Sequence, residues 1–258
     1  MTKQLPMKQK IDDLKTLFAK YEAESAKLLQ GVIAPERLTR LVVDAAIKNP
    51  KLADCTPPSL VGAMLTCAAL QLEPGVANQC WIIPYGKNAT FVPGYQGLAQ
   101  LAYRSSRIST LVANVAYSKD SFKYTDAPPL VEHTRHEGED RGEFTHAYAG
   151  AQNVNGHWQW VVMQAWEVEK VRKRSAAATS SGSPWSHPDD VNEMRKKTAF
   201  KRLFKWLPMS IAENAPLARA IELDNLADQG LSQELEADVV DFDDVQYDGP
   251  KESEQHSG

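Results

Sequence analysis

A strong hairpin signal in the second half of the chain restricts its fold more than any other feature. Two β-rich segments, 144–153 and 157–164, flank Asn155-Gly156, a dipeptide that favours the tight turns of antiparallel hairpins. Residues 80–85 and 89–93 surround a Gly-Lys-Asn turn in the same manner, and they predict a second hairpin. The sequence therefore indicates a sheet made of antiparallel strands.

Helical segments surround the predicted strands. Apolar residues recur with helical spacing from Ile11 to Gln30, and Pro35 opens a second helix that stops before Pro50. Helices followed by hairpins and then by helices predict the α+β class, with a small antiparallel sheet flanked by helices. Further helices are predicted over 60–72, 94–105, 165–174, 189–207 and 211–220, and further strands over 110–117 and 130–134.

The charges are unevenly distributed along the chain, although the formal net charge is −4. Residues 221–258 contain twelve acidic side chains and one basic side chain, whereas residues 1–220 contain 28 basic and 21 acidic side chains. A body of net charge +7 beside an end of −11 indicates a polyanionic partner. We expect a helical segment over 1–34 that could serve oligomerisation, a binding core over 35–220 and a disordered acidic tail over 221–258.

The predicted helix 189–207 combines core residues and cations on opposite faces. Lysines four residues apart rise about 6 Å per step, close to the phosphate repeat of an extended single strand. Many like charges on one face cost stability, so an anionic partner is favoured over an ordinary solvated face. The cations of the polar face are Arg195, Lys197, Lys201, Arg202 and Lys205, and Lys196 falls within the apolar arc.

A second basic cluster precedes a segment rich in Ser and Gly, 175–183. This cluster predicts the other wall of a groove for single-stranded DNA, and its members are Lys170, Arg172, Lys173 and Arg174. Trp185 is a candidate platform for base stacking, with a tryptophan that caps the core as the equal alternative. Weaker candidates for DNA contact are Lys87, Tyr95, Arg104 and Arg107.

No motif of a nucleotide-binding loop or of a nucleophilic active site is present in the sequence. We therefore expect no ATP, no other cofactor and no enzyme activity. One alternative stays open, because His133 and His136 precede Glu137, Glu139 and Asp140. These side chains could hold a metal in a nuclease-like, metal-dependent DNA-processing enzyme.

The cysteines and the apolar segments predict a cytoplasmic protein. Cys55, Cys67 and Cys80 form no CxxC pair, which is typical of reduced thiols. No apolar run approaches the roughly 20 residues of a membrane-spanning helix, and residues 1–20 show no secretory signal. Binding of the basic helix to a membrane surface is disfavoured, because its apolar face is needed for the core.

Several separate motifs, in matching order over roughly 35–210, resemble the RecT family of phage and prophage single-strand annealing proteins. Two mild departures are Gln96, where members often have a basic residue, and Ser106, where they often have glycine. The motifs are Gln71-Leu-Glu-Pro-Gly75, Trp81-Ile-Ile-Pro-Tyr-Gly86, Gly94-Tyr-Gln-Gly97, Ala102-Tyr-Arg-Ser105, Met194-Arg-Lys-Lys-Thr-Ala199 and Arg202-Leu-Phe-Lys-Trp-Leu-Pro-Met-Ser210.

The resemblance implies an ATP-independent recombination protein in the cytoplasm of a bacterial host. Such proteins coat single-stranded DNA as a homo-oligomer or filament, pair it with a complementary strand and hold the nascent duplex. They usually work beside a phage exonuclease, and some contact the host single-strand-binding protein. The acidic tail is then expected to regulate DNA binding or to dock a partner.

Overall fold

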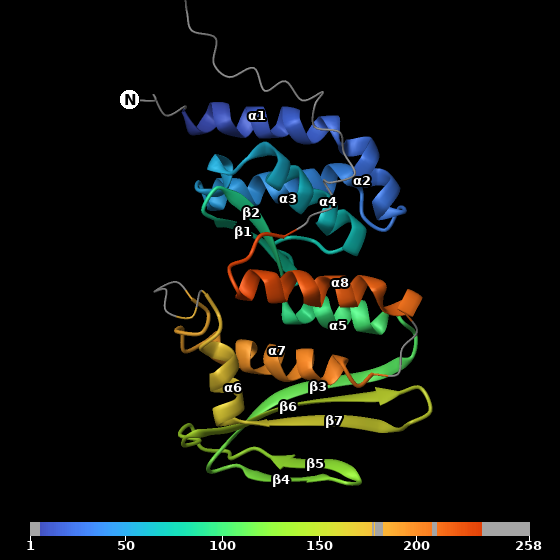
Figure 1. The fold of residues 1–258 in the computed structure, drawn as a ribbon, viewed down its shortest axis with the longest axis vertical. Coiled ribbons are helices and arrows are strands. Elements are labelled where there is room, and N and C mark those ends of the chain that lie inside the picture. The colour runs from blue at the N-terminus through green and yellow to red at the C-terminus, as the bar shows by residue number, and fades with distance from the viewer. Residues whose placement is uncertain (1–5, 177, 179–182, 208–210, 234–258) are drawn as a thin grey trace, which may run out of the picture.

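Layers of helices and strands are stacked along the long axis of the molecule (Figure 1). The computed structural model describes residues 6–176, 178, 183–207 and 211–233. One end of the stack consists of helices α1 (Met7–Lys20), α2 (Glu22–Leu29), α3 (Pro35–Lys48) and α4 (Pro57–Leu70), with a 3-10 turn at Leu52–Asp54.

Helix α4 forms the apolar centre of this end. Ten of its 14 residues are buried, as expected for a helix that is apolar on nearly all sides. Two prolines occupy its first turn, where their missing N–H groups cost no hydrogen bond. At its other end the Arg104 guanidinium donates hydrogen bonds to the carbonyls of Leu70 (2.6 Å) and Gln71 (2.7 Å). Arg104 therefore stabilises the carboxyl end of α4.

The middle of the stack contains a hairpin and two helices. Strands β1 (Cys80–Tyr85) and β2 (Asn88–Pro93) pair with each other, and helices α5 (Tyr95–Tyr103) and α8 (Ile211–Asp228) lie beside them. The side-chain amide of Gln233 accepts a hydrogen bond from the Phe91 N–H (2.9 Å) and donates one to the Phe91 carbonyl (2.7 Å). Gln233 thus occupies the edge of β2 that does not face β1.

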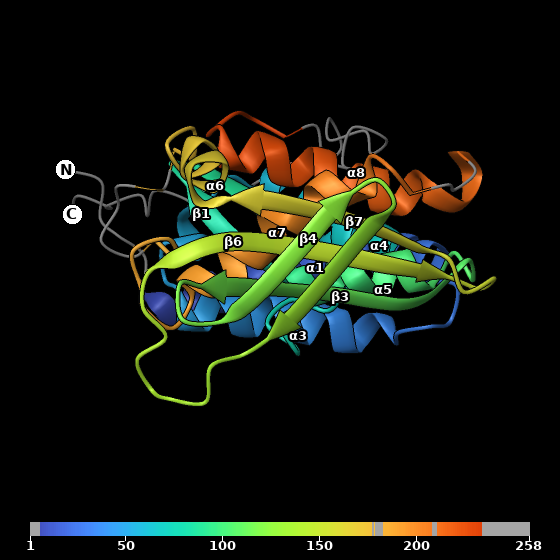
Figure 2. The ribbon, with the colours of Figure 1, turned by 90° about the horizontal axis from the view of Figure 1, so that it is seen from below.

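The other end is a three-stranded antiparallel sheet in the order β3-β6-β7. Helix α7 covers its inner face, and the β4–β5 hairpin crosses its outer face (Figure 2). Buried Val115, Ala147 and Met163 belong to the same core as Phe200 and Leu203 of α7. The elements are β3 (Ile108–Tyr117), β4 (Ser121–Asp126), β5 (Pro129–Thr134), β6 (Phe144–Asn153), β7 (Trp158–Gln164), α6 (Ala165–Arg172) and α7 (Val191–Phe204).

The predicted α+β class is confirmed, and so are both predicted hairpins. Two local predictions were wrong. The helix predicted over 11–30 is divided at Tyr21 into α1 and α2. Strand β4 was missed, because only Phe122 and Tyr124 alternate with polar residues in it. None of the described helices is both long enough and apolar enough to cross a bilayer.

The boundary predicted for the acidic tail was also wrong. Helix α8 does not end near Ala220 but continues to Asp228, and Ile221, Leu223 and Ala227 are buried in it. The prediction rested on the many acidic residues of 221–258, and it overlooked the apolar residues that recur among them up to Ala227. Residues 234–258 lie outside the described part of the chain, so the expectation of disorder there stays a prediction. The role of 1–34 in oligomerisation also stays a prediction.

Candidate nucleic-acid interface

Two lysines of α7 point into the protein and not toward solvent. Lys197 Nζ lies 2.5 Å from Asp224 Oδ1, and the exposed fractions of these side chains are 8% and 1%. Lys201 Nζ lies 2.7 Å from Asp224 Oδ2 and 3.0 Å from Asp228 Oδ2. The expected solvent-facing row of cations is therefore wrong for Lys197 and Lys201. Their partners come from α8, in the segment that had been assigned to the tail.

This buried cluster is held by mutual attraction. Burial acts to raise the pKa of Asp224, but the ammonium groups of Lys197 and Lys201 outweigh it and keep the pKa of this carboxyl low. Burial alone would lower the pKa of Lys201, but both aspartates raise it. Two ammonium groups and two carboxylates thus neutralise one another. Little of their positive charge is available to an outside ligand.

Two further cations of α7 are engaged near its amino end. The Arg195 guanidinium lies 3.9 Å from the centroid of the Phe144 ring and donates a hydrogen bond to Asn192 Oδ1 (2.9 Å). Lys196, expected within the apolar arc, is half-buried and pairs with Glu193 at 2.7 Å. Both side chains are therefore fixed by neighbours, although each retains N–H groups that could reach a ligand.

A groove connects the two basic clusters. It is a cavity of about 740 Å³ between the end of α6, α7 and α8, and it is lined by Arg174, Lys201, Arg202 and Lys205. Lys205 is exposed, and Arg202 keeps 43% of its side chain exposed while it pairs with Glu167 at 2.5 Å. The structure thus brings together cations from two separate segments. Binding of DNA by these residues stays a prediction.

The rest of the second basic cluster surrounds the end of α6. The Lys170 ammonium lies 4.5 Å from the centroid of the Trp166 ring, and Arg172 pairs with Glu169 at 3.1 Å. Lys173 is exposed in the turn that follows. Residues 177 and 179–182 of the expected loop 175–183 lie outside the described residues.

Trp185 is not a platform for base stacking. Only 4% of its surface is exposed, and it belongs to the hydrophobic core. The alternative interpretation, a tryptophan that caps the core, is the one that the structure supports. Trp185 is buried because elements that are distant in the sequence pack around it. The prolines and serines next to it in the sequence do not reveal this packing.

The weaker candidates divide into packed and exposed residues. Tyr95 packs edge-on against Phe200 with the ring centroids 5.5 Å apart, and burial raises its pKa to about 12. Arg104 is engaged at the end of α4, as described above. Lys87, at the tip of the β1–β2 hairpin, and Arg107 are exposed. The contacts of Tyr95 and Arg104 are structural, and a DNA contact by any of the four stays a prediction.

The Gly94-Tyr-Gln-Gly97 motif also has a structural explanation. A Cβ atom on Gly94 would collide with the carbonyl oxygen of Asn78, and one on Gly97 would collide with that of Gln79. The Gly94 N–H donates a hydrogen bond to this second carbonyl at 2.8 Å. These glycines therefore allow the 71–79 loop to lie directly against the first turn of α5.

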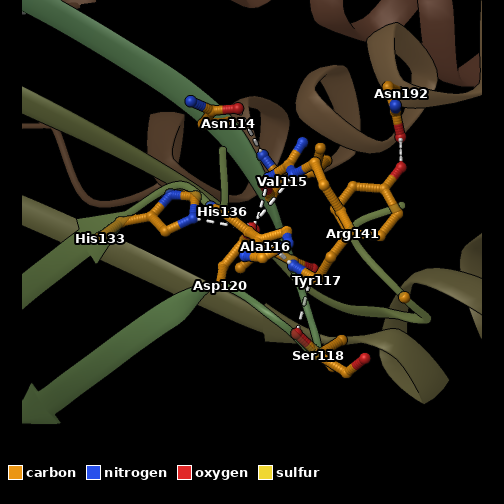
Figure 3. A network of polar contacts seen from close by, with 12 residues as sticks. Asn114, Val115, Ala116, Tyr117, Ser118, Asp120, His133, His136, Arg141 and Asn192 are labelled. Carbon is orange, nitrogen blue, oxygen red and sulfur yellow. Dashed lines mark hydrogen bonds and ion pairs between the residues drawn. The ribbon is translucent and has the colours of Figure 1, made fainter. Parts of the chain in front are cut away.

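Of the two histidines proposed as metal ligands, the His133 side chain belongs to a buried ion-pair network, whereas His136 is exposed and contributes only its main-chain N–H (Figure 3). The Asp120 side chain is fully buried, and its carboxylate accepts hydrogen bonds from the main-chain N–H of His136 (2.9 Å), from Arg141 and from His133 Nε2 (3.1 Å). The other ring nitrogen of His133 is 2.8 Å from the Tyr148 hydroxyl. Both nitrogens of His133 are therefore occupied by protein groups. Within the described ranges, no three side chains are grouped as ligands for a metal ion.

This network predicts a specific pH dependence of stability. Burial acts to raise the pKa of Asp120, but Arg141 and the other hydrogen-bond donors outweigh it and hold the pKa well below its usual range. The stabilisation is therefore present above the pKa of the unfolded state, about 3.9, and is lost as the pH falls toward the folded-state pKa. We expect Asp120→Asn to lower the free energy of unfolding by about 2 kcal/mol at pH 7, and by less at pH 3.

Urea denaturation of both proteins at pH 7 and pH 3 measures this difference. The matched control is Asp140→Asn, since Asp140 also pairs with a cation, Lys119, but is 78% exposed. We expect a change of less than about 0.5 kcal/mol for the control. An equal loss at both pH values for Asp120→Asn would contradict the assignment.

Comparison with known proteins adds independent information about this chain. A model of the RecT family matches residues 36–238, which includes α8 and the groove. The chain is 36% identical over 210 residues to protein RecT of Escherichia coli K12, covering 77% of this chain and 74% of the relative. It is 25% identical over 212 residues to the uncharacterized protein YqaK of Bacillus subtilis 168, covering 78% of this chain and 71% of the relative. The chain therefore belongs to the RecT family of single-strand annealing recombination proteins.

Proposed function

We propose that this protein anneals complementary strands of DNA without ATP, and that the first strand binds in the groove between α6, α7 and α8. The observation that carries the proposal is the convergence of Arg174, Arg202 and Lys205 on one cavity of about 740 Å³. These side chains come from two segments of a chain that belongs to a family of DNA-annealing proteins.

Neutralisation of phosphate charge explains how such a groove promotes annealing. Two strands repel each other through their phosphates, and lysine or arginine contacts to one backbone release its counterions. Phosphate contacts carry no sequence information, so an annealing protein can accept any strand in this way. Contacts to phosphate leave the base edges free to test a complementary partner, and the protein makes and breaks no covalent bond.

A homo-oligomer or filament would extend the groove from one subunit to the next. Binding would then be cooperative and sensitive to salt, because each added subunit contributes further phosphate contacts. In this proposal the protein acts in the cytoplasm of a bacterial host and holds the nascent duplex. An exonuclease of phage type would supply the single strands, and the host single-strand-binding protein is a further candidate partner.

The decisive experiment mixes two complementary fluorescent oligonucleotides with the protein in buffer without nucleotide. We expect pairing to be faster with the protein than without it, and unchanged by added ATP. A non-complementary pair is the control and is expected to give no duplex. Unchanged pairing kinetics would contradict the proposal, and shortened products in the presence of magnesium would favour the nuclease-like alternative.

A further inference from the structure

A second cavity lies beside the groove, on the other side of α6. It has a volume of about 350 Å³ and is lined by the start of β6, by α6 and by the start of α7. The buried side chain of Trp185 lines both cavities, so they are neighbours separated by this ring and by α6. The proposed function does not use this cavity.

An exposed indole forms part of the second cavity. Trp166, the second residue of α6, is 55% exposed, and its Nε1 donates a hydrogen bond to Gln164 at 2.7 Å. Lys170, one helical turn later, places its ammonium 4.5 Å from the ring centroid. The ammonium therefore lies over one face of the indole, and the exposed remainder of the ring is available for stacking. An aromatic ligand that carries negative charge would stack on this ring and be attracted by the cation.

The polar lining of the cavity offers both donors and acceptors. The guanidinium groups of Arg172 and Arg195 supply donors, and the carboxylates of Glu143 and Glu169 supply acceptors. Arg172 Nε pairs with Glu169 Oε2, but both side chains stay partly exposed, and their other polar atoms are the ones offered to a ligand. Arg195 is held in place by the Phe144 ring and by Asn192. A phosphate only accepts hydrogen bonds from these groups, whereas the edge of a nucleobase both donates and accepts. The combination therefore fits a base better than a bare phosphate.

We propose that the second cavity receives an unstacked nucleobase of the bound DNA strand, which stacks on Trp166 and meets Arg172 and Arg195 with its polar edge. This inference rests on the proposed function, because it requires a strand in the neighbouring groove. Lys173 and Arg174 are exposed cations at the end of α6, and Arg174 lines the groove. We expect them to contact the phosphates of a strand that reaches from one cavity to the other. A base held out of its stack in this way would keep the strand extended.

Substitution of Trp166 separates this inference from the phosphate contacts of the groove. Base stacking on an aromatic side chain is worth about 1–3 kcal/mol per base. We therefore expect Trp166→Ala to weaken binding of an oligonucleotide by about 5-fold or more, and Trp166→Phe to retain most of the affinity. The dependence of log Kd on log salt concentration should stay unchanged, since no phosphate contact is lost. Fluorescence anisotropy with a labelled oligonucleotide measures all three quantities.

A fully abasic oligonucleotide, which keeps every phosphate, is the matched probe. We expect the wild type and Trp166→Ala to bind it with equal affinity, and thermal unfolding of each variant establishes that it is folded. If the wild type binds ordinary single-stranded DNA but Trp166→Ala binds it equally well, the nucleobase site is overturned and the proposed function stands. An equal loss on the abasic probe would also overturn it. Failure of the wild type to bind any single strand overturns the proposed function itself.

Discussion

Replacing Asp224 with alanine is expected to lower the free energy of unfolding by about 3–5 kcal/mol, because it leaves two buried ammonium groups short of a partner. Asp224 bonds to both Lys197 and Lys201, and its side chain is 1% exposed. The remaining carboxylate, Asp228, reaches only Lys201 among the contacts of this cluster. Urea denaturation followed by circular dichroism measures the change at pH 7.

Two further variants test whether the loss of stability comes from the buried cluster. Glu222→Ala removes a carboxylate of the same helix that pairs with Arg219 at 3.1 Å and is 61% exposed, so we expect a loss below about 1 kcal/mol. Adding Lys197→Met to Asp224→Ala removes the unpaired charge, and we expect it to restore part of the lost stability. A loss for Asp224→Ala no larger than that for Glu222→Ala would contradict the buried cluster.

Combined replacement of Arg174, Arg202 and Lys205 by alanine is expected to weaken binding of single-stranded DNA roughly 100-fold at about 0.1 M salt. Each phosphate contact to a single strand contributes about 0.7 to the salt slope, so the loss of three contacts should flatten this slope by about 2. These are the groove cations whose charge is not neutralised within the buried cluster. Fluorescence anisotropy titrations at several salt concentrations give both numbers.

The matched control removes the same charge at a distant site. Lys15, Lys20 and Lys27 are exposed on α1 and α2, at the opposite end of the stack from the sheet. Their combined replacement by alanine changes the net charge equally, and we expect the affinity to fall by less than about 3-fold, since long-range attraction is screened by salt. Equal weakening by both triple variants would exclude the proposed groove.

Local signals were sufficient to predict much of this fold. The turns at Gly86 and Asn155-Gly156 determine their hairpins through nearby residues, and the prolines at the start of α3 and α4 mark helix starts. Strand β4 was missed because it is mostly polar and pairs with β5 on the outer side of the sheet. The second half of α8 was missed because its acidic residues concealed the apolar positions that pack into the core.

The candidate site shows even more clearly that local sequence patterns do not reveal contacts between distant segments. The groove walls were predictable from clusters of basic residues, but the availability of each charge was not. Lys201 and Lys205 are one helical turn apart, yet among the described side chains Lys201 alone of the two meets carboxylates from α8. Trp185, the predicted stacking platform, is buried, whereas Trp166, for which the sequence suggested no role, is 55% exposed. Burial of an indole depends on elements that are distant in the sequence.

The side-chain amide of Gln233 at the edge of β2 has a consequence for self-association. An uncovered strand edge offers its main-chain groups to any other extended chain, and such edges are common starting points of aggregation. Gln233 satisfies both main-chain groups of Phe91, as a neighbouring strand would. In the proposed filament, many copies of the chain would lie close together, and the amide of Gln233 would prevent the edge of β2 from pairing with a strand of a neighbouring subunit.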